Sequence, residues 1–429
     1  MGLLKKILAR SPKITADREK TGQNPYFGNG APHDAWIFAK FSAYSVYCHN
    51  RSQEFAAFDR FLLILGLHHW NMYTNFKRIA VKVGSNVLTG SSGLLNKTLI
   101  GSLVDQLVEL RRRGIEVVLI SSGAVAAGRS MLQTPEKTDA VSARQALSSV
   151  GQVKLMNIYA AFFEKHNFLC SQVLVTKEDF RDRTHYLNMK NCFTTLLQHK
   201  VIPIVNENDS VAITELMFTD NDELAGLIAA MINADALFIL TNVDGVYRGD
   251  PGSPGSELLR TIEATDIDFS QFVSSKKSNF GRGGMITKCN IARKAALSGM
   301  HVFIANGAKE NILQRLLKGE EEGTHFLPSG KTSTLKKWVA YSGGFAKGSV
   351  VINEGASAAL HSSKATSILP VGVIKIEGEF KKGDIIKIYD ESGAYLGLGR
   401  AQYGYEKAIE RKGLKNQKPL VHYDYLYLA

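Results

Sequence analysis

The sequence has little that would tie it to a membrane or to an oxidising compartment. Its longest apolar run, Phe61 to Leu67, is far shorter than the roughly 20 residues that a membrane-spanning helix needs. Only four cysteines occur in 429 residues, and no two of them form a C-x-x-C pair. They are Cys48, Cys170, Cys192 and Cys289. This spacing excludes a disulfide framework and a cysteine zinc site, so we expect a soluble protein of the reducing cytoplasm.

Length and composition indicate an ordinary globular protein. A chain of 429 residues exceeds one compact core, which favours two domains and allows three. Hydrophobic residues make up 45% and charged residues 21%, both usual values. The net charge of +12 is compatible with nucleic-acid binding, with an enzyme that handles anionic substrates, and with a basic surface that binds nothing.

Three segments differ in pattern. Residues 1–76 show no sustained periodicity and no chemical motif, and we expect a poorly ordered extension there. Residues 77–327 alternate apolar runs rich in β-branched residues with helical stretches. Residues 334–429, after the turn-rich linker Pro328-Ser329-Gly330-Lys331, carry short alternating runs such as GVIKIEG and DIIKIYD and little helix beyond GASAALHSS. The last segment is expected to be a separate, mainly β domain.

The middle segment predicts a parallel sheet covered by helices on both faces, because its strand runs contain few charges. The predicted strands are RIAVKVG (78–84), VVLISSG (117–123), QVLVT (172–176), VIPIVNEND (201–209), ALFILTN (236–242) and HVFIANG (301–307). Ligands of such sheets bind at the carboxyl ends of the strands. The polar and glycine-rich residues of this segment fall at those ends.

Two lysines have the context of phosphate ligands. Lys82 lies in an apolar strand and is followed by Gly84, which would let a phosphate approach the backbone. Lys288 falls in the first turn of a predicted helix that the glycine-rich loop GRGGMITK (281–288) opens. The spacing of that loop is not that of a Walker loop. Taken alone, Lys82 is better explained as a lysine whose side chain reaches solvent from a strand end. The glycine-rich loop is explained equally well as an ordinary loop.

Two clusters of acidic and amide residues lie close together in the chain. NEND (206–209) ends a predicted strand run, and TDND (219–222) comes about ten residues later. The second stands at the start of the helical stretch ELAGLIAAMINA, where Asp and Asn are favoured as N-caps. Capping accounts for one of these residues but does not explain the other acidic and amide residues. Two clusters at one sheet edge suit the binding of an ammonium group and the positioning of cations.

Taken together, these motifs resemble those of the amino acid kinase family, and within it the glutamate 5-kinase branch. The resemblance is carried, in order, by KVGSNVLTG, ISSGAVAAGR, VNENDSVA, FTDNDELA, LTNVDGVY and GRGGMITK, and it covers residues 77–327. The C-terminal segment resembles a PUA domain, an RNA-binding-type module. The resemblance implies an α/β/α sandwich with a mainly parallel sheet. It also implies transfer of the γ-phosphate of ATP, with Mg²⁺, to the side-chain carboxylate of L-glutamate, the first step of proline biosynthesis.

The resemblance also implies residue roles. Lys82 and Lys288 are expected to neutralise the transferring phosphoryl group, with Asp222 holding both lysines. The residues expected to bind glutamate are Ser122, Asp209 and Asn221, supported by Asn206 and Asp220. Those expected around ATP are Lys82, Gly84, Thr241, Asn242, Arg282, Gly283, Gly284, Met285, Ile286, Thr287 and Lys288. A carboxylate acceptor is already a nucleophile at neutral pH, so no general base is needed.

Three positions depart from the family pattern and concern nucleotide contacts. Asn242 stands where Asp is frequent, Arg282 replaces a small residue, and Asn86 replaces a small hydroxyl residue. Two other interpretations remain open: an amino acid kinase with a different acceptor, and an RNA-binding protein with a relic kinase domain. RNA binding is not expected, because the C-terminal lysines are scattered and its tyrosines suit a small β core.

Four further expectations accompany the resemblance. Proline is expected to inhibit in competition with glutamate through residues 177–190 and Glu215, and a glutamyl-phosphate reductase to take up the product. A homo-oligomer is expected. Residues 1–71 are expected to be dispensable, with translation starting at Met72, shortly before the first strand.

Overall fold

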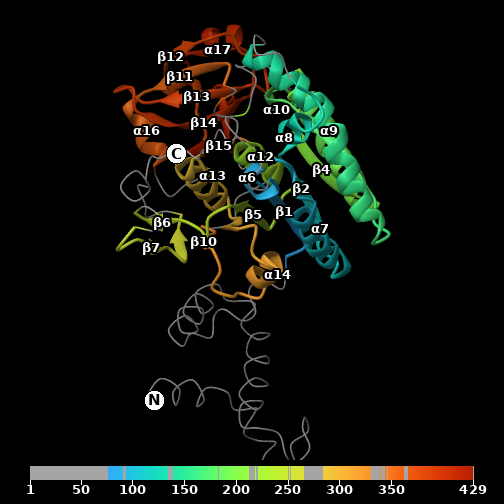
Figure 1. Cartoon of the computed structure of the whole chain (residues 1–429). Coiled ribbons are helices and arrows are strands. Elements are labelled where there is room, and N and C mark those ends of the chain that lie inside the picture. Colours follow the sequence, from blue (N-terminus) through green and yellow to red (C-terminus); the bar gives the residue numbers. More distant parts are fainter. Residues whose placement is uncertain are drawn as a thin grey trace, which may run out of the picture. The chain divides into compact units, whose positions relative to one another are not determined.

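The structure is a computed structural model of the whole chain (Figure 1). The residues that it describes are 76–89, 93–133, 139–181, 183–211, 218, 221–249, 251, 253–264, 284–329, 339, 344, 346–361 and 366–428. The predicted N-terminal extension therefore lies outside the described residues, apart from Phe76. In the described part of the chain, no helix is long and apolar enough to cross a membrane.

Six parallel strands form the centre of the larger sheet in the described residues. Their spatial order is β3 (Cys170–Val175), β4 (Ile202–Glu207), β2 (Glu116–Ile120), β1 (Arg78–Val83), β5 (Ala236–Thr241) and β9 (His301–Asn306). Each corresponds to a predicted strand run, and neighbours pair in parallel. The prediction of a mainly parallel α/β sheet is confirmed.

Two short strands extend this sheet beyond β9. Strand β10 (Thr324–Leu327) pairs antiparallel with β9, and β8 (Thr261–Glu263) pairs parallel with β10. A hairpin of two very short strands precedes them in the chain. It is formed by β6 (Tyr247–Arg248) and β7 (Glu257–Leu258). None of these was predicted, because runs of two to four residues carry too little alternation to read from sequence.

Helices cover both faces of the sheet, because successive strand residues point to opposite sides. Val81 and Val117 pack on one face, in a core shared with α7 (Lys97–Arg112), α9 (Ala140–Glu164) and α14 (Ile312–Leu317). Ala80 and Val118 pack on the other face, with α11 (Arg183–Gln198), α12 (Asn221–Met231) and α13 (Met285–Leu297). The predicted α/β/α sandwich is confirmed.

Side-chain caps set the start of the two longest helices on the first face. The Asn96 side chain accepts hydrogen bonds from the backbone N–H groups of Thr98 and Leu99 at the start of α7. Asp139 does the same at the start of α9. The predicted helical stretch through residue 165 is therefore two helices, because α8 (Ala124–Arg129) ends before the Asp139 cap begins α9.

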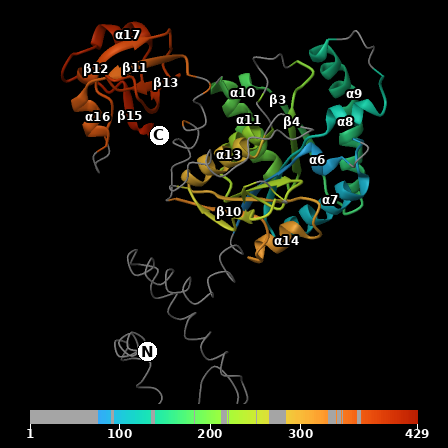
Figure 2. The same cartoon turned by 60° about the vertical axis from the view of Figure 1, so that its left-hand side comes forward.

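The C-terminal segment forms a second, mainly β fold (Figure 2). Its five strands are β12 (Val373–Glu377), β11 (Gly348–Ile352), β13 (Ile385–Tyr389), β14 (Tyr395–Ala401) and β15 (Val421–Leu428), in that spatial order. The expected helix is α16 (Glu354–Leu360), and α17 (Tyr405–Arg411) is an additional one. Val350, Ile386 and Val421 belong to its own buried core.

Candidate active site

The carboxyl ends of the parallel strands bring the predicted polar residues to one edge of the sheet. Lys82 lies near the end of β1, Ser122 follows β2, and Asn206 lies near the end of β4. Thr241 ends β5, which pairs with β1 on its other side. All of these strands run in the same direction, so their ends lie at the same edge of the sheet, where open α/β sheets bind ligands.

The centre of the site is one carboxylate held between two lysines. Asp222 Oδ1 lies 2.6 Å from Lys82 Nζ, and Asp222 Oδ2 lies 2.8 Å from Lys288 Nζ. The Asp222 side chain is fully buried, and both lysines are buried. Burial alone would raise the pKa of Asp222, but the two lysines outweigh it and lower that pKa to about 2. Asp222 is therefore ionised at neutral pH and fixes two ammonium groups side by side.

Three different elements deliver these charges. Lys82 comes from a strand, whereas Asp222 and Lys288 come from the first turns of α12 and α13. Gly84 leaves space open, because a Cβ there would lie 3.5 Å from Lys82 Nζ. Its backbone N–H, however, donates to Leu240 O at 3.1 Å, so any role of this glycine is to make room rather than to donate.

The side chain of Asn221 joins this centre to a second group of polar residues. Its amide nitrogen lies 2.8 Å from Ser121 O, 2.9 Å from Ser122 Oγ and 3.1 Å from Asn206 Oδ1. Because Asn221 directly precedes Asp222, one turn of α12 serves both groups. The predicted acceptor residues Ser122 and Asn206 thus both contact Asn221, the neighbour of Asp222 in the chain.

A buried pair of hydroxyl groups, from Ser121 and Tyr159, stabilises the turn that carries Ser122. Ser121 Oγ and Tyr159 Oη lie 3.0 Å apart, and Ser121 Oγ also donates to Ser122 O. Burial raises the pKa of Tyr159, so its hydroxyl stays protonated. Gly123 follows with a φ of 97°, a left-handed conformation that favours glycine and turns the chain into α8.

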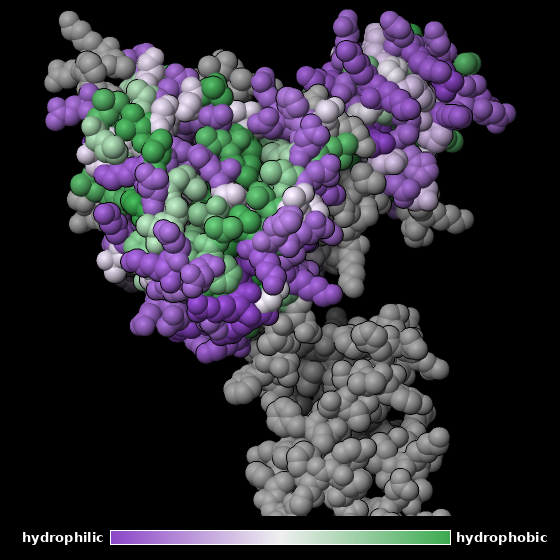
Figure 3. All heavy atoms as spheres, turned by 90° about the vertical axis from the view of Figure 1, so that its right-hand side faces the viewer, coloured by the Kyte–Doolittle hydropathy of each residue, from purple (hydrophilic) through white to green (hydrophobic). Residues whose placement is uncertain are grey.

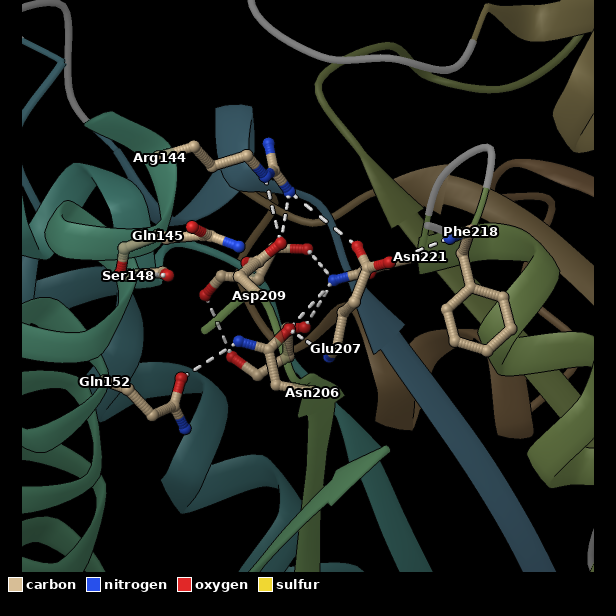
Figure 4. Close-up of polar contacts among 11 residues, drawn as sticks. Arg144, Gln145, Ser148, Gln152, Asn206, Glu207, Asp209, Phe218 and Asn221 are labelled. Atoms are coloured by element: carbon tan, nitrogen blue, oxygen red, sulfur yellow. Dashed lines mark hydrogen bonds and ion pairs between the residues drawn. The ribbon is translucent and has the colours of Figure 1, made fainter. Parts of the chain in front are cut away.

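Asp209, also predicted, lies in an ion-pair cluster with a residue that the sequence did not suggest (Figure 4). Arg144 Nη2 and Nε approach Asp209 Oδ1 at 2.7 and 2.9 Å, and Arg144 Nη2 lies 3.7 Å from Glu207 Oε2. Glu207 is buried and its Oε1 accepts a 2.7 Å hydrogen bond from the backbone N–H of Phe218. The carboxylates of Asp209 and Glu207 are thereby both fixed.

Helix α9 forms a wall beside these residues. Arg144, Ser148 and Gln152 are spaced four residues apart, so they share one face of the helix. Gln152 Oε1 accepts a 3.0 Å hydrogen bond from Asn206 Nδ2, which orients the Asn206 amide so that its oxygen meets Asn221. Figure 4 shows these side chains of α9 directed towards Asn206 and Asp209. The 144-148-152 spacing was readable, but nothing in sequence tells which face of a helix meets a site.

Helix α9 packs very closely against α8, because a glycine on each helix leaves no side chain between the two backbones. A Cβ on Gly128 would overlap the carbonyl oxygen of Leu147, and a Cβ on Gly151 would overlap that of Ala124. The backbones of α8 and α9 are therefore in direct contact. This contact couples the Ser122 turn, which leads into α8, to the helix that carries Arg144.

The predicted nucleotide residues are only partly described. Thr241 is buried and Asn242 exposed at the end of β5, with 3.4 Å between Thr241 Oγ1 and Asn242 Oδ1. Gly284 caps α13, and its first turn contains Met285, Ile286, Thr287 and Lys288. The predicted residues Asp220, Arg282 and Gly283, and the proposed inhibitor contact Glu215, lie outside the described residues.

The site offers anion-binding charge rather than a ready metal cage. Among the described residues, no group of three His, Cys, Asp or Glu side chains could hold a metal ion. Asp222, the fully buried carboxylate, is engaged by both lysines. A magnesium ion would fit this site as part of a metal–nucleotide complex, bound mainly through phosphate oxygens, as is usual for Mg²⁺.

A parallel α/β sheet that carries two neighbouring lysines at its carboxyl edge is suited to binding a phosphorylated ligand. The amino acid kinase family model matches residues 77–306, and the PUA domain model matches residues 348–423. The chain belongs to the amino acid kinase family.

Curated relatives narrow the class. A glutamate 5-kinase of Bacteroides thetaiotaomicron is 53% identical over 360 residues, which are 83% of this chain and all of that protein. A glutamate 5-kinase of Chlorobaculum tepidum is 50% identical over 355 residues, 82% of this chain and 98% of the relative. One from Dehalococcoides mccartyi is 39% identical over 348 residues, 80% of this chain and 93% of the relative. These similarities confirm the glutamate 5-kinase branch that the motifs indicated.

Proposed function

We propose that the protein transfers the γ-phosphate of ATP to the side-chain carboxylate of L-glutamate and forms L-glutamyl 5-phosphate, the first step of proline biosynthesis. The observation that carries this function is the pair of ammonium groups on Asp222, one residue away from the Asn221 network. Lys82 and Lys288 would face the phosphoryl group from two sides. The acceptor network would hold the attacking carboxylate in line with it.

The chemistry needs positioning and charge neutralisation rather than proton abstraction. The transferring phosphoryl group carries negative charge on its equatorial oxygens, and two fixed ammonium groups lower the energy of that charge in a water-poor site. When bound with ATP, Mg²⁺ would add positive charge at the phosphates. Asp222 keeps the lysines apart and oriented, and the acceptor carboxylate is ionised at neutral pH without help.

The direct test is trapping of the acyl phosphate. Purified protein with ATP, Mg²⁺ and hydroxylamine should form γ-glutamyl hydroxamate with L-glutamate. It should form little or no hydroxamate with aspartate, N-acetylglutamate or carbamate. Preference for another acceptor would replace the substrate assignment and keep the reaction type. Absence of ATP consumption with every acceptor would contradict a working kinase.

Proline is proposed as an inhibitor that competes with glutamate. The segment 177–190 approaches the acceptor side, because Lys177 Nζ lies 3.3 Å from Glu223 Oε2, in the first turn of α12. The helix α10 (Lys177–Arg181) begins this segment. A ligand against it would disturb the turn that contains Asn221. Inhibition by proline that glutamate does not relieve would contradict a shared or overlapping site.

Two further proposals concern the location of the protein and its pathway partner. The protein would work in the cytoplasm, where ATP and glutamate are available. Its acyl phosphate is reactive, so a glutamyl-phosphate reductase that accelerates its capture is the proposed pathway partner. Addition of that reductase should raise the yield of reduced product and lower the amount of acyl phosphate that is lost by cyclisation. An unchanged yield would contradict the partnership.

A homo-oligomer is the remaining proposal. Apolar side chains gather on the face that bears α9 (Figure 3). Met131 and Val153 are 58% and 63% exposed, and both line a hollow of about 600 Å³ there. Light scattering should give a mass above that of one chain, and Val153→Glu should lower it. A monomer at all concentrations would contradict the proposal.

A further inference from the structure

Arg144 has the placement of a ligand-binding cation rather than of a structural one. Its two closest nitrogens converge on a single oxygen of Asp209, so the parallel two-oxygen pairing that arginine forms best with a carboxylate is not made. The Arg144 side chain is 30% exposed, whereas the side chains of Asp209 and Glu207 are 7% and 3% exposed. The arginine therefore has more room to turn towards a ligand than the two buried carboxylates have.

Arg144 faces two carboxylates at once. Its guanidinium contacts both Asp209 and Glu207, and the closer contact is with Asp209. A substrate ammonium group can replace the guanidinium as the partner of Asp209. The α-carbon of an amino acid, however, carries an α-carboxylate beside its ammonium group. Unpaired, that carboxylate would face two buried like charges at a large energetic cost.

The lysines are poorly placed to compensate for the α-carboxylate. Both are held by Asp222, and their proposed partner is the phosphoryl group at the other end of the acceptor. Arg144 is already in contact with both carboxylates of the acceptor side, on a helix whose position the Gly128 and Gly151 contacts fix. It needs only a side-chain rotation to meet an anion bound next to Asp209.

We propose that Arg144 recognises the α-carboxylate of the acceptor amino acid. On binding, Asp209 exchanges Arg144 for the substrate ammonium group, and Arg144 pairs with the adjacent α-carboxylate. The exchange gives the substrate ammonium group and the α-carboxylate each a partner of opposite charge, and it selects acceptors that carry both groups on one carbon. This inference rests on the proposed function, because it specifies how the same site holds glutamate by the end that does not react.

The experiment compares L-glutamate with its α-amide, L-isoglutamine, in the hydroxamate assay. The α-amide keeps the ammonium group and the reacting γ-carboxylate but has no α-carboxylate. The wild-type enzyme should prefer glutamate strongly in kcat/KM. Arg144→Gln should lower kcat/KM for glutamate by about 10- to 100-fold, the range of a lost charge-assisted hydrogen bond, mainly through KM. The variant should use the α-amide about as well as the wild type does.

The ratio of kcat/KM for glutamate to kcat/KM for its α-amide distinguishes binding of the α-carboxylate by Arg144 from a purely structural role. If Arg144 only neutralises Asp209 or braces the fold, Arg144→Gln changes both acceptors by the same factor, and the proposal is overturned. Equal use of both acceptors by the wild type would overturn it as well. A wild type that makes no hydroxamate from any acceptor would instead refute the proposed function.

Two further variants keep the test decisive. Arg144→Lys retains the charge but not the planar fork, so it should keep part of the preference for glutamate. A Lys variant without any such preference, although folded by circular dichroism, would count against the proposal. Lys154→Gln removes one positive charge from the same helix, where Lys154 contacts Ser130 Oγ. It should leave the acceptor ratio unchanged.

Discussion

Replacement of Asp222 by Asn is expected to destabilise the protein strongly while preserving its shape. In the wild type, one fully buried carboxylate is the shared partner of Lys82 and Lys288. Asn has nearly the same volume but carries no charge. The variant would leave two buried ammonium groups next to each other, without the anion that separates them.

The magnitude follows from the loss of a buried partner. Removal of one member of a buried ion pair costs about 3–5 kcal/mol, because the remaining charge is uncompensated. The lowering of the Asp222 pKa from 3.8 to about 2 corresponds to about 2 kcal/mol of stability that comes from its ionised form alone. For a domain of this size, a loss of 3–5 kcal/mol lowers Tm by on the order of 10 °C.

The pH dependence has a defined sign. The folded pKa of Asp222 lies below its unfolded value, so its contribution is fully present above pH ~4 and is lost as the pH falls through ~2. The asparagine side chain of the variant does not titrate. The gap in stability between the wild type and Asp222→Asn should therefore be constant near neutrality and shrink only in acid.

Calorimetry at pH 7 would measure the effect, with Asp244→Asn as control. Asp244 is a partly exposed partner of Lys309, and its loss should cost at most about 1 kcal/mol. ATP with Mg²⁺ should raise the Tm of Asp222→Asn more than that of the wild type, because the phosphates supply the missing anion. A variant that melts within about 2 °C of the wild type would refute the view that Asp222 compensates both lysines.

Three other outcomes are expected. Lys82→Ala and Lys288→Ala should each lower the rate of hydroxamate formation by roughly a hundredfold or more, and full activity of either would remove that lysine from the mechanism. Gly151→Ala should lower the free energy of unfolding by about 1–3 kcal/mol or more, because its Cβ overlaps the backbone of α8; an unchanged Tm would contradict the close approach. A chain that starts at Met72 should keep its kinase activity and Tm, because every site residue described above follows it; an insoluble or inactive product would refute this.

The strands and the positions of the two lysines could be predicted from the sequence for different reasons. An apolar strand such as residues 78–83 has a local pattern, and parallel strands necessarily bring their carboxyl ends together. Lys82 and Asn206 could therefore be assigned to one edge of the sheet from the strand pattern alone. The direct contacts of Asp222 with Lys82 and Lys288 needed the family resemblance, because the separation along the chain hides them.

Arg144 and Gln152 were missed because their role depends on the rotation of α9 about its axis. The sequence of α9 shows a helix but no marked amphipathic face, because its buried side includes Ser148 and Gln152 beside apolar residues such as Leu147 and Leu155. The hydrogen bonds from Gln152 to Asn206 and from Arg144 to Asp209 each join residues more than 50 positions apart in the chain. The role expected of Gly84 was also incomplete, because only the structure shows its N–H engaged by Leu240.

The direct contact of α8 and α9 restricts how this enzyme could change its substrate. Where helices touch through side chains, a small substitution lets one helix slide and reshapes a pocket gradually. At Gly128 and Gly151 no smaller residue can be introduced, because glycine is already the smallest, so α9 has a single register against α8. A descendant with a longer or shorter acceptor would have to exchange individual side chains at positions 144, 148 or 152, one discrete step at a time.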